Sequence, residues 1–439
     1  MEIVNSWMNR GVLLHPLEGE SIVDVSRSLV VKSTENKKLL FVLLDGLGMN
    51  LFEKLMKEYH KPGKLCNGNC GSFFCRFYSR PVRSIFPAAT AAALTSYGTG
   101  NFPSQHGILG WVLRYSDTKT ALSDMKSEGI FYNPLPWKTV DKQPLNIPEE
   151  SVFAFSSCWR DIKLPRRSIS VFADSKATRA YTATAPNGSI SPGVQEYGLA
   201  IKCDGLSIDL SEALEKVEEI WRGNEPGNFT YVYCHHPDSL EHAHGVFSLE
   251  VNQKLKQLDK QLMEFWERTE TVQNQEVVVC ADHGQVDGQA IYIPRVIKLD
   301  GRFGCSGAVR LDNTMEHRCP MVWLTHSGCT GECSQEKMVE FVIETLSMVI
   351  VEQRKSLGIF CEGEEDLGWA FLLPEEIKAL KLFGPAEFSP AAEAQLGHFL
   401  GITRTNEYLT FKDEGLHVVG MHGSLVPQEV LVPLFEAKN

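Results

Sequence analysis

The stretch Phe41-Val-Leu-Leu-Asp45-Gly-Leu-Gly48 places an acidic residue and two glycines directly after a run of large apolar residues. An apolar run bounded by a turn signal predicts a strand that is buried in a sheet. The glycines permit the tight turn that must follow. We therefore expect Asp45 at the end of a buried strand, where it is a candidate ligand. Taken alone, Asp45 is equally consistent with a helix cap.

The same pattern returns further along the chain. The runs 39–44, 229–234 and 277–281 are apolar, and each is followed by a polar residue. Stretches with helical periodicity alternate with them, at 210–221, 249–265 and 337–351. This alternation predicts an α/β fold with a mostly parallel central sheet and helices on both faces. In such sheets, ligands bind beyond the carboxyl ends of the strands.

The sequence contains no Pro/Gly/Ser-rich linker or low-complexity tract that would divide it. We expect a single domain over residues 1–439. Residues 112–205 are rich in loops, and residues 327–405 form another irregular stretch that carries a strand-like run at 369–373. We expect both segments to be insertions or caps on the core.

Composition excludes several classes of protein. The chain has 439 residues, 43% of them hydrophobic and 22% charged, which suits a large globular core. A net charge of −12 without a Lys/Arg-rich run argues against polymeric nucleic acid as a partner. Neither a membrane-spanning apolar run nor a secretory signal is recognisable. We expect a cytoplasmic protein without membrane contact, and its oligomeric state stays open.

The 12 cysteines are expected to be mostly buried thiols. Cys234 and Cys280 lie inside apolar runs, and a reducing cytosol disfavours disulfides. The alternative is a zinc site built from the closely spaced cysteines, but these lack the CxxC pairs of common zinc modules.

A second informative stretch is Phe86-Pro-Ala-Ala-Thr90-Ala-Ala-Ala-Leu-Thr95, which predicts an alanine-rich helix that begins at Thr90. The free amides and the dipole at a helix N-terminus stabilise a phosphate and an incipient alkoxide. Considered alone, Thr90 is explained more simply as an ordinary N-cap.

Residues 233–245 are rich in imidazole and carboxylate groups. Asp238 and His242 are four residues apart and can share a helical face, and this pair of ligand types suits Zn²⁺. Three other imidazoles in the segment are open between a direct and a supporting role: His235, His236 and His244.

Two further pieces complete the pattern. Val277-Val-Val-Cys280-Ala-Asp282-His283-Gly284 puts Asp and His together at a strand end. Near the C-terminus, Gly420-Met-His422-Gly423 flanks a histidine with glycines, which would let the backbone approach a metal closely.

In this order, the five segments resemble the alkaline phosphatase superfamily, specifically its nucleotide pyrophosphatase/phosphodiesterase branch. The ligand order of that branch is Asp, Thr, Asp-x-x-x-His, Asp-His and His. The likeness covers residues 38–110, 229–285 and 415–435, and it includes the run Thr99-Gly-x-x-Pro103-x-x-His106-Gly-Ile. It implies an alkaline-phosphatase-like three-layer fold and two divalent cations, with Zn²⁺ as the expected metal.

The resemblance also implies two ligand sets: Asp45, Asp282 and His283 for one cation, with Thr90 as its neighbour, and Asp238, His242 and His422 for the other. With cations there, the Thr90 hydroxyl would ionise more readily and attack phosphorus, giving a phosphothreonine.

Two positions depart from the branch. Its nucleotide-hydrolysing members typically place Phe after the nucleophile, where this chain has Ala91. They also place an Asn a few residues after His-Gly-Ile, where this chain has Trp111. Trp111 either contacts substrate, through its indole N–H or its ring, or packs in the core.

These departures keep three functions open. The expected one is a phosphodiesterase or nucleotide pyrophosphatase acting on a small phosphate ester. The alternative on the same site is a phosphomonoesterase or phosphonate hydrolase. From a different class, the chain would be a non-catalytic protein that binds metal and phosphate.

Overall fold

The structure is a computed structural model. It describes residues 1–33, 36–59, 71–115, 125, 130–133, 138–140, 143, 158–162, 164–171, 203–207, 209–223, 227–300, 303, 307–327, 334–359, 367–412 and 418–439. Most of the segment 112–205, predicted as a cap, lies outside these residues.

A seven-stranded mixed sheet forms the first layer of the fold. Its strands are β1 (Lys38–Leu44), β2 (Tyr78–Arg83), β6 (Arg166–Val171), β7 (Cys203–Ser207), β8 (Asn228–Cys234), β9 (Gln275–Cys280) and β19 (Leu431–Lys438). The spatial order is β2-β19-β9-β1-β8-β6-β7. The five strands from β9 to β7 run parallel. At one edge, β19 is antiparallel to both of its neighbours, β9 and β2.

The three central strands of this sheet are the apolar runs predicted from the sequence. All of β1 except Lys38 is buried, and β9 is buried along its whole length, as expected for parallel strands covered on both faces. Leu44 of β1 pairs with Cys234 of β8, and Leu43 pairs with Cys280 of β9. The three strands therefore end at one edge of the sheet.

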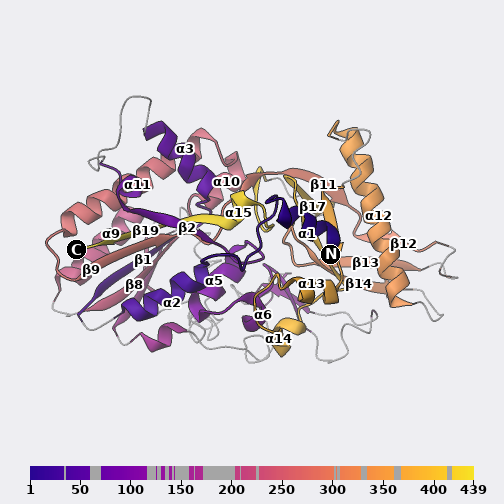
Figure 1. Cartoon of the computed structure of the whole chain (residues 1–439), viewed down its shortest axis with the longest axis horizontal. Coiled ribbons are helices and arrows are strands. Elements are labelled where there is room, and N and C mark those ends of the chain that lie inside the picture. Colours follow the sequence, from indigo (N-terminus) through magenta and orange to yellow (C-terminus); the bar gives the residue numbers. More distant parts are fainter. Residues whose placement is uncertain are drawn as a thin grey trace.

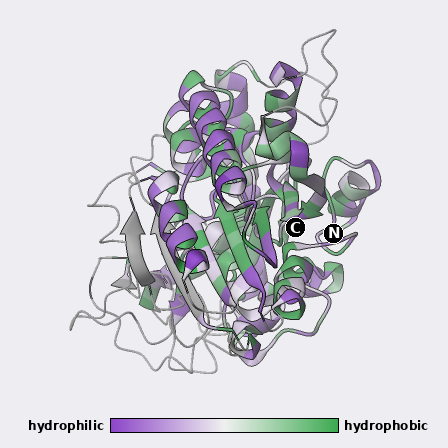
Figure 2. Ribbon diagram, turned by 90° about the vertical axis from the view of Figure 1, so that its left-hand side faces the viewer, coloured by the Kyte–Doolittle hydropathy of each residue, from purple (hydrophilic) through white to green (hydrophobic). Residues whose placement is uncertain are grey.

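Helices cover both faces of the central sheet. They are α2 (Ile22–Lys32), α3 (Met49–Tyr59), α4 (Phe73–Phe77), α5 (Thr90–Thr99), α9 (Leu210–Arg222), α10 (Asp238–His244) and α11 (Leu249–Thr269), with a 3-10 turn η2 (Cys158–Asp161). Figure 1 shows α3 and α11 on one side of the sheet and α2 and α5 on the other. In Figure 2, hydrophobic strands lie between helices that carry hydrophilic residues. The expected three-layer α/β arrangement is confirmed.

A second sheet has five antiparallel strands in the order β12-β13-β14-β16-β15. Its strands are β12 (Val296–Lys298), β13 (Ala308–Asn313), β14 (Met321–Ser327), β15 (Trp369–Leu372) and β16 (Phe399–Thr403). The long helix α12 (Gln335–Ser356) packs its apolar side into the core of this region. Part of the segment 327–405 thus belongs to a sheet that begins before it.

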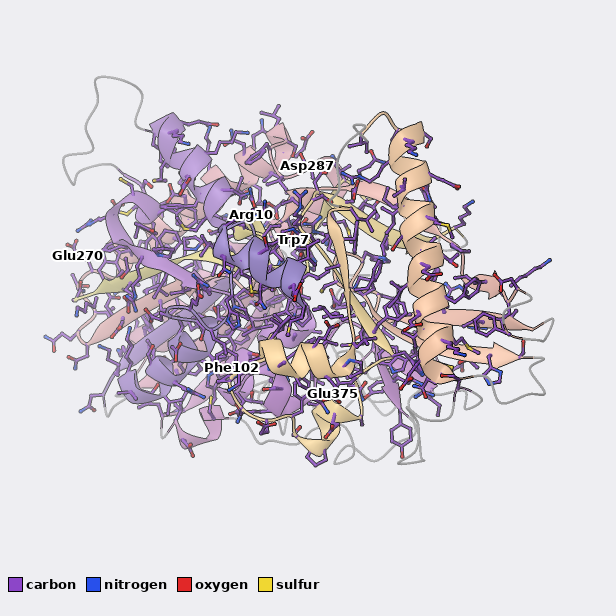
Figure 3. The ribbon with its side chains drawn as sticks, turned by 45° about the vertical axis from the view of Figure 1, so that its right-hand side comes forward. Trp7, Arg10, Phe102, Glu270, Asp287 and Glu375 are labelled. Atoms are coloured by element: carbon purple, nitrogen blue, oxygen red, sulfur yellow. The ribbon has the colours of Figure 1, made fainter. Side chains whose placement is uncertain are left out.

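Shorter elements complete the fold. The helices are α1 (Glu2–Asn9), α6 (Pro103–His106), α13 (Pro374–Leu380), α14 (Pro390–Glu393) and α15 (Pro427–Val430). The strands are β3 (Leu113–Tyr115), β4 (Ile130–Asn133), β5 (Lys138–Thr139), β10 (Val286–Asp287), β11 (Gln289–Ile293), β17 (Glu407–Phe411) and β18 (Gly420–Met421). Figure 3 shows Trp7 of α1 and Asp287 of β10 near the middle of the molecule, between the central sheet and α12. Trp7 is fully buried there in a core shared with Phe86 and Val430.

Two further expectations concern cysteines and membranes. Among the residues that the structure describes, four cysteines are free thiols: Cys158, Cys234, Cys280 and Cys319. Cys234 and Cys280 are buried, as their apolar surroundings predict. Within the described ranges, no helix is both long and apolar enough to cross a bilayer.

Candidate active site

The turns that follow β1, β8 and β9 converge at the common edge of the central sheet. The backbone N–H of Asp45 donates to the carbonyl of Cys234, and the carbonyl of Asp45 accepts from the N–H of Asp238, both at 2.9 Å. These bonds join the turn after β1 to the start of α10. Side chains from three separate segments therefore meet where ligands bind in open α/β sheets.

Asp45, Asp282 and His283 form the first cluster. Each offers one ligand atom, these atoms lie within 4.8 Å of one another, and all three residues are buried. His283 Nε2 lies 3.6 Å from Asp45 Oδ1 and 3.4 Å from Asp282 Oδ2. Neither of these two carboxylate oxygens has a hydrogen-bond partner in the part of the chain that the structure describes. Because unpaired buried carboxylate oxygens are costly, the cluster suits a cation.

The remaining atoms of the first cluster are held by the protein. Tyr233 donates its hydroxyl to Asp45 Oδ2, and the N–H groups of Gly46 and His283 donate to Asp282 Oδ1 at 3.1 and 2.9 Å. His283 Nδ1 donates to the carbonyl of Gly284 at 3.2 Å. This bond fixes the tautomer in which Nε2 keeps its lone pair, as in metal-ligating histidines.

Asp238, His242 and His422 form the second cluster, again with ligand atoms within 4.8 Å of one another. One turn of α10 brings His242 Nε2 to 3.3 Å from Asp238 Oδ1, and His422 Nε2 lies 3.8 Å from the same oxygen. His242 Nδ1 donates to the carbonyl of Gly420 at 2.7 Å, and His422 Nδ1 donates to that of Ala88 at 3.0 Å. Both Nε2 atoms thus face the cluster, where each offers a lone pair once its imidazole is neutral.

The two clusters are neighbours. The rings of His283 and His422 stack with centroids 3.8 Å apart and an interplanar angle of 20°. The two clusters are therefore in contact through these stacked rings. A pair of nearby cations is the arrangement that clamps a phosphoryl group between attacking and leaving oxygens.

Thr90 is the first residue of α5, and its side chain lies at the first cluster. Thr90 Oγ1 is 3.1 Å from His283 Nε2, and the residue is 8% exposed. Ala88, two residues before Thr90, donates its N–H to the carbonyl of Gly423 at 3.3 Å, which joins the Thr90 turn to the His422 loop. The hydroxyl is thus held at a helix N-terminus, where an anion is favoured.

The electrostatics of the clusters favour cations. Burial, followed by the negative charges of Asp282 and Asp238, holds the pKa of Asp45 well above its usual value. Burial lowers the pKa of His242, but Asp238 outweighs this effect and raises it to about 9. Burial also opposes ionisation of Asp238, yet His242 holds its pKa below the ordinary range. Positive charge is therefore stabilised among these acidic groups.

The other residues named as candidates from the sequence lie outside the two clusters. His235 and His236 contact each other with ring centroids 4.1 Å apart, and His236 Nδ1 is 3.0 Å from Ser239 Oγ. Trp111 is half-buried, and its backbone N–H donates to Oε1 of the buried Glu316 at 2.5 Å. Ala91 is fully buried in α5, so its position offers no aromatic surface beside Thr90.

Three residues near the site have no role in the sequence-based prediction. Tyr233 supports Asp45, and the Gln285 side chain donates to Asp238 Oδ1. Glu241 is fully buried, and neither of its carboxylate oxygens has a partner among the described residues. Their positions next to predicted ligands were the available signal, but adjacency in sequence does not say which side chain turns inward.

A mostly parallel sheet whose strand-end turns carry two Asp/His triads beside a helix-initial threonine defines the class of alkaline-phosphatase-like phosphohydrolases. The sequence matches the family model of type I phosphodiesterase/nucleotide pyrophosphatase over residues 39–425. The chain belongs to this family, within the alkaline phosphatase superfamily. It is a hydrolase of phosphoric ester or anhydride bonds.

Solved structures share the fold at low sequence identity. Murine ectonucleotide pyrophosphatase/phosphodiesterase 5 matches with a TM-score of 0.55 and 12% identity over 91% of this chain and 87% of its own. An inactive threonine-to-alanine variant of that protein in complex with AMP matches with a TM-score of 0.51 and 13% identity over the same shares. Phosphonoacetate hydrolase from Sinorhizobium meliloti 1021, in complex with phosphonoformate, matches with a TM-score of 0.51 and 16% identity over 92% of this chain and 90% of its own. No curated protein sequence matches significantly.

Proposed function

We propose that this chain is a metal-dependent phosphodiesterase or nucleotide pyrophosphatase that acts on a small phosphate ester with Thr90 as its nucleophile. The observation that carries the proposal is the position of Thr90 Oγ1, 3.1 Å from His283, at the N-terminus of α5 and beside two Asp/His triads. A threonine that only capped a helix or packed in the core would not need two Asp/His triads beside it.

Two Zn²⁺ ions fit the donor sets, because each set combines imidazole nitrogen and carboxylate oxygen and leaves open positions for substrate. Asp45, Asp282 and His283 would hold one ion, with Thr90 as a further neighbour. Asp238, His242 and His422 would hold the other. When bound, the ions supply positive charge that stabilises an alkoxide and the phosphoryl oxygens. The unpaired oxygens of Asp45 and Asp282 support this assignment.

The residues of the chain then perform two displacements. Thr90 Oγ1 loses its proton to solvent and forms a bond to phosphorus as the bond to the leaving oxygen breaks. The leaving group keeps the electron pair and takes up a proton from solvent. The N-terminal amides of α5 stabilise the transferred phosphoryl group. Water next attacks phosphorus, the bond to Thr90 breaks, and the hydroxyl is restored. The inactivity of the threonine-to-alanine variant of the murine relative supports a nucleophilic threonine.

A second candidate is a phosphomonoesterase or phosphonate hydrolase on the same residues. It is favoured by the fully buried Ala91, which leaves no aromatic platform for a base next to Thr90. The likeness to phosphonoacetate hydrolase also supports it. In either case, we propose that the segments 112–205 and 327–405 act as caps that select the leaving group. The free thiols of Cys158, Cys234, Cys280 and Cys319 support the proposed cytoplasmic location.

A substrate panel with acid quenching tests the proposal. Zinc-loaded protein is mixed with bis(p-nitrophenyl) phosphate, a dinucleotide, p-nitrophenyl phosphate or phosphonoacetate, and peptides are analysed for phosphate on Thr90. Turnover of diesters and a phosphorylated Thr90 peptide support the leading function. Preference for the monoester or the phosphonate selects the second candidate. A metal-loaded protein without turnover on any substrate would instead support a non-catalytic binding protein.

A further inference from the structure

A fully buried ion pair lies behind the candidate active site. Arg318, in the turn between β13 and β14, places Nε and Nη2 each 2.6 Å from Glu429 Oε1 of α15. Both side chains are 0% exposed. Burying two charges is expensive and is not needed to hold apolar layers together. The buried Arg318–Glu429 pair therefore requires an explanation other than packing.

Glu429 contacts the chain next to a histidine of each cluster. Its second carboxylate oxygen, Oε2, accepts the N–H of Ser424 at 2.6 Å, two residues after His422. Its backbone carbonyl accepts the N–H of Gly284 at 2.8 Å, directly after His283. One residue thus holds both loops that carry the stacked pair of histidines.

Helix α15 packs closely against these loops. A Cβ atom on Gly284 would lie 2.2 Å from the carbonyl oxygen of Gln428, the residue before Glu429. In the turn that carries Arg318, Cys319 donates its thiol to the carbonyl of Gly423 at 2.8 Å. A shift of Glu429 or of the Arg318 turn would therefore be transmitted to His422 and His283.

Arg318 is fixed from the opposite side by the segment that leads from β16 into β17. Its Nη1 donates to the carbonyl of Glu407 at 2.9 Å, and Nη2 donates to that of Thr405 at 2.7 Å. The planar guanidinium suits such simultaneous contacts, because its donors diverge in fixed directions. Arg318 therefore orients the Glu429 carboxylate toward the N–H of Ser424.

We propose that Arg318 and Glu429 are positioning residues that set the spacing of the two metal-binding clusters by fixing His422 relative to His283. The inference rests on the proposed metal-dependent function. Neither residue touches the clusters directly, so each acts through the backbone of Ser424 and Gly284. Outer contacts of this kind commonly control the affinity of a metal site.

Two double variants separate positioning from simple stability. Arg318→Met with Glu429→Leu removes both charges and the acceptor for Ser424. Arg318→Met with Glu429→Gln removes both charges but keeps an amide oxygen that can accept the same N–H. Replacing both members of a buried pair avoids leaving a lone buried charge, which would confuse the result with unfolding. Circular dichroism verifies that each variant is folded.

The matched control is another buried pair, in which Arg354 Nε lies 2.8 Å from Glu407 Oε1. Arg354→Met with Glu407→Gln removes comparable charges without altering a bond to Ser424 or Gly284. Full-length metal-free proteins are titrated with Co²⁺, and the visible spectrum and a competing chelator report the number and affinity of sites.

We expect two cobalt sites in the wild-type protein and the control pair. The Met/Leu variant should lose about 10–100-fold in affinity at one of them, and the Met/Gln variant should recover most of this loss. Equal cobalt binding by the wild-type and Met/Leu proteins would overturn the inference while leaving the proposed function intact. An equal loss in the control pair would overturn it as well. A wild-type protein that binds no cobalt would overturn the proposed function and the inference together.

Discussion

At the scale of single residues, a proposed ligand side chain uses one atom to hydrogen-bond to the protein and leaves another atom facing the cluster. Asp282 Oδ1 accepts two backbone N–H groups, while Oδ2 has no partner among the described residues. His242 and His422 each donate through Nδ1 to a carbonyl, so that Nε2 is the ring atom that faces the cluster. If these residues bind a cation as proposed, their orientation is already set before binding, which would lower the entropy lost.

The first prediction concerns the Thr90 hydroxyl. Thr90→Ala should lower kcat by about 10³-fold or more, because removal of a nucleophile leaves only binding and electrostatic catalysis. Thr90→Ser keeps a hydroxyl and should retain much more activity. Steady-state kinetics on the preferred ester and metal analysis of each purified variant provide the measurement. Unimpaired turnover by the alanine variant would refute the assignment of Thr90 as the nucleophile.

The second prediction concerns His242, whose pKa is raised from 6.5 to about 9 in the metal-free protein. The stability contributed by the protonated form is present in full below pH 6.5 and is lost as the pH rises through about 9. A metal requires the neutral imidazole, so metal uptake at pH 7 should release a proton. Release should diminish as the pH passes 9.

Calorimetric titration of Zn²⁺ in buffers with different ionisation enthalpies measures this release. The apparent enthalpy at pH 7 should change with the buffer in the direction of proton uptake by the buffer. The prediction would be refuted by a binding enthalpy that does not depend on the buffer at pH 7.

At the scale of secondary-structure elements, the site depends on where strands end and on what packs behind their turns. β1, β8 and β9 end at a common edge because their registers are aligned. The short helix α15 then lies against the turns after β1 and β9, where Gly48 and Gly284 leave room for its backbone. Glycine is required here by close approach, since a side chain has no space.

Gly284→Ala tests this packing. Its Cβ would lie 2.2 Å from Gln428 O and 2.6 Å from the Cα of Gly48, so the backbone must move. We expect a loss of stability of about 1–3 kcal/mol, together with weaker metal binding as His283 shifts. Gly71→Ala is the control, because a Cβ there meets nothing within 4 Å. Thermal melting and Co²⁺ titration compare the two variants, and equal behaviour would contradict the packing account.

The elements around the site differ in how well they could be predicted. β1, β8 and β9 follow from long apolar runs, and α9 and α11 follow from clear helical periodicity. The antiparallel pairing of β19 with β9 was not predicted, because pairing direction depends on the path of the chain and not on local pattern. Strand β12 has only three residues, too few for a periodic signal.

At the scale of the whole molecule, the central sheet supplies Asp45 and Asp282, and the C-terminal segment returns from the second sheet region to supply His422. The sequence motifs name all six predicted ligands, and the structure brings them together as two triads. Metal binding by them stays a prediction. Contacts such as Trp111 with Glu316, or Arg318 with Glu429, join residues 205 and 111 positions apart. No local pattern encodes such pairs, so only the folded chain reveals them.

Removal of metal should destabilise the whole molecule. The metal-free site holds several buried carboxylates whose charges repel one another, and a ligand that binds only the folded state stabilises it by about 2.7 kcal/mol at 100 times its Kd. Calorimetry should therefore show a lower Tm after chelation and recovery on addition of Zn²⁺. Asp282→Asn should weaken the recovery. A Tm that does not respond to chelation of metal-loaded protein would count against structural coupling of the site.

The central claim is that two cations flank Thr90. Anomalous diffraction at the zinc absorption edge, from crystals of the zinc-loaded protein, tests it most directly. We predict two peaks, one about 2.0–2.2 Å from ligand atoms of Asp45, Asp282 and His283, and the other at the same range from Asp238, His242 and His422. A single peak, or peaks away from both triads, would contradict the account.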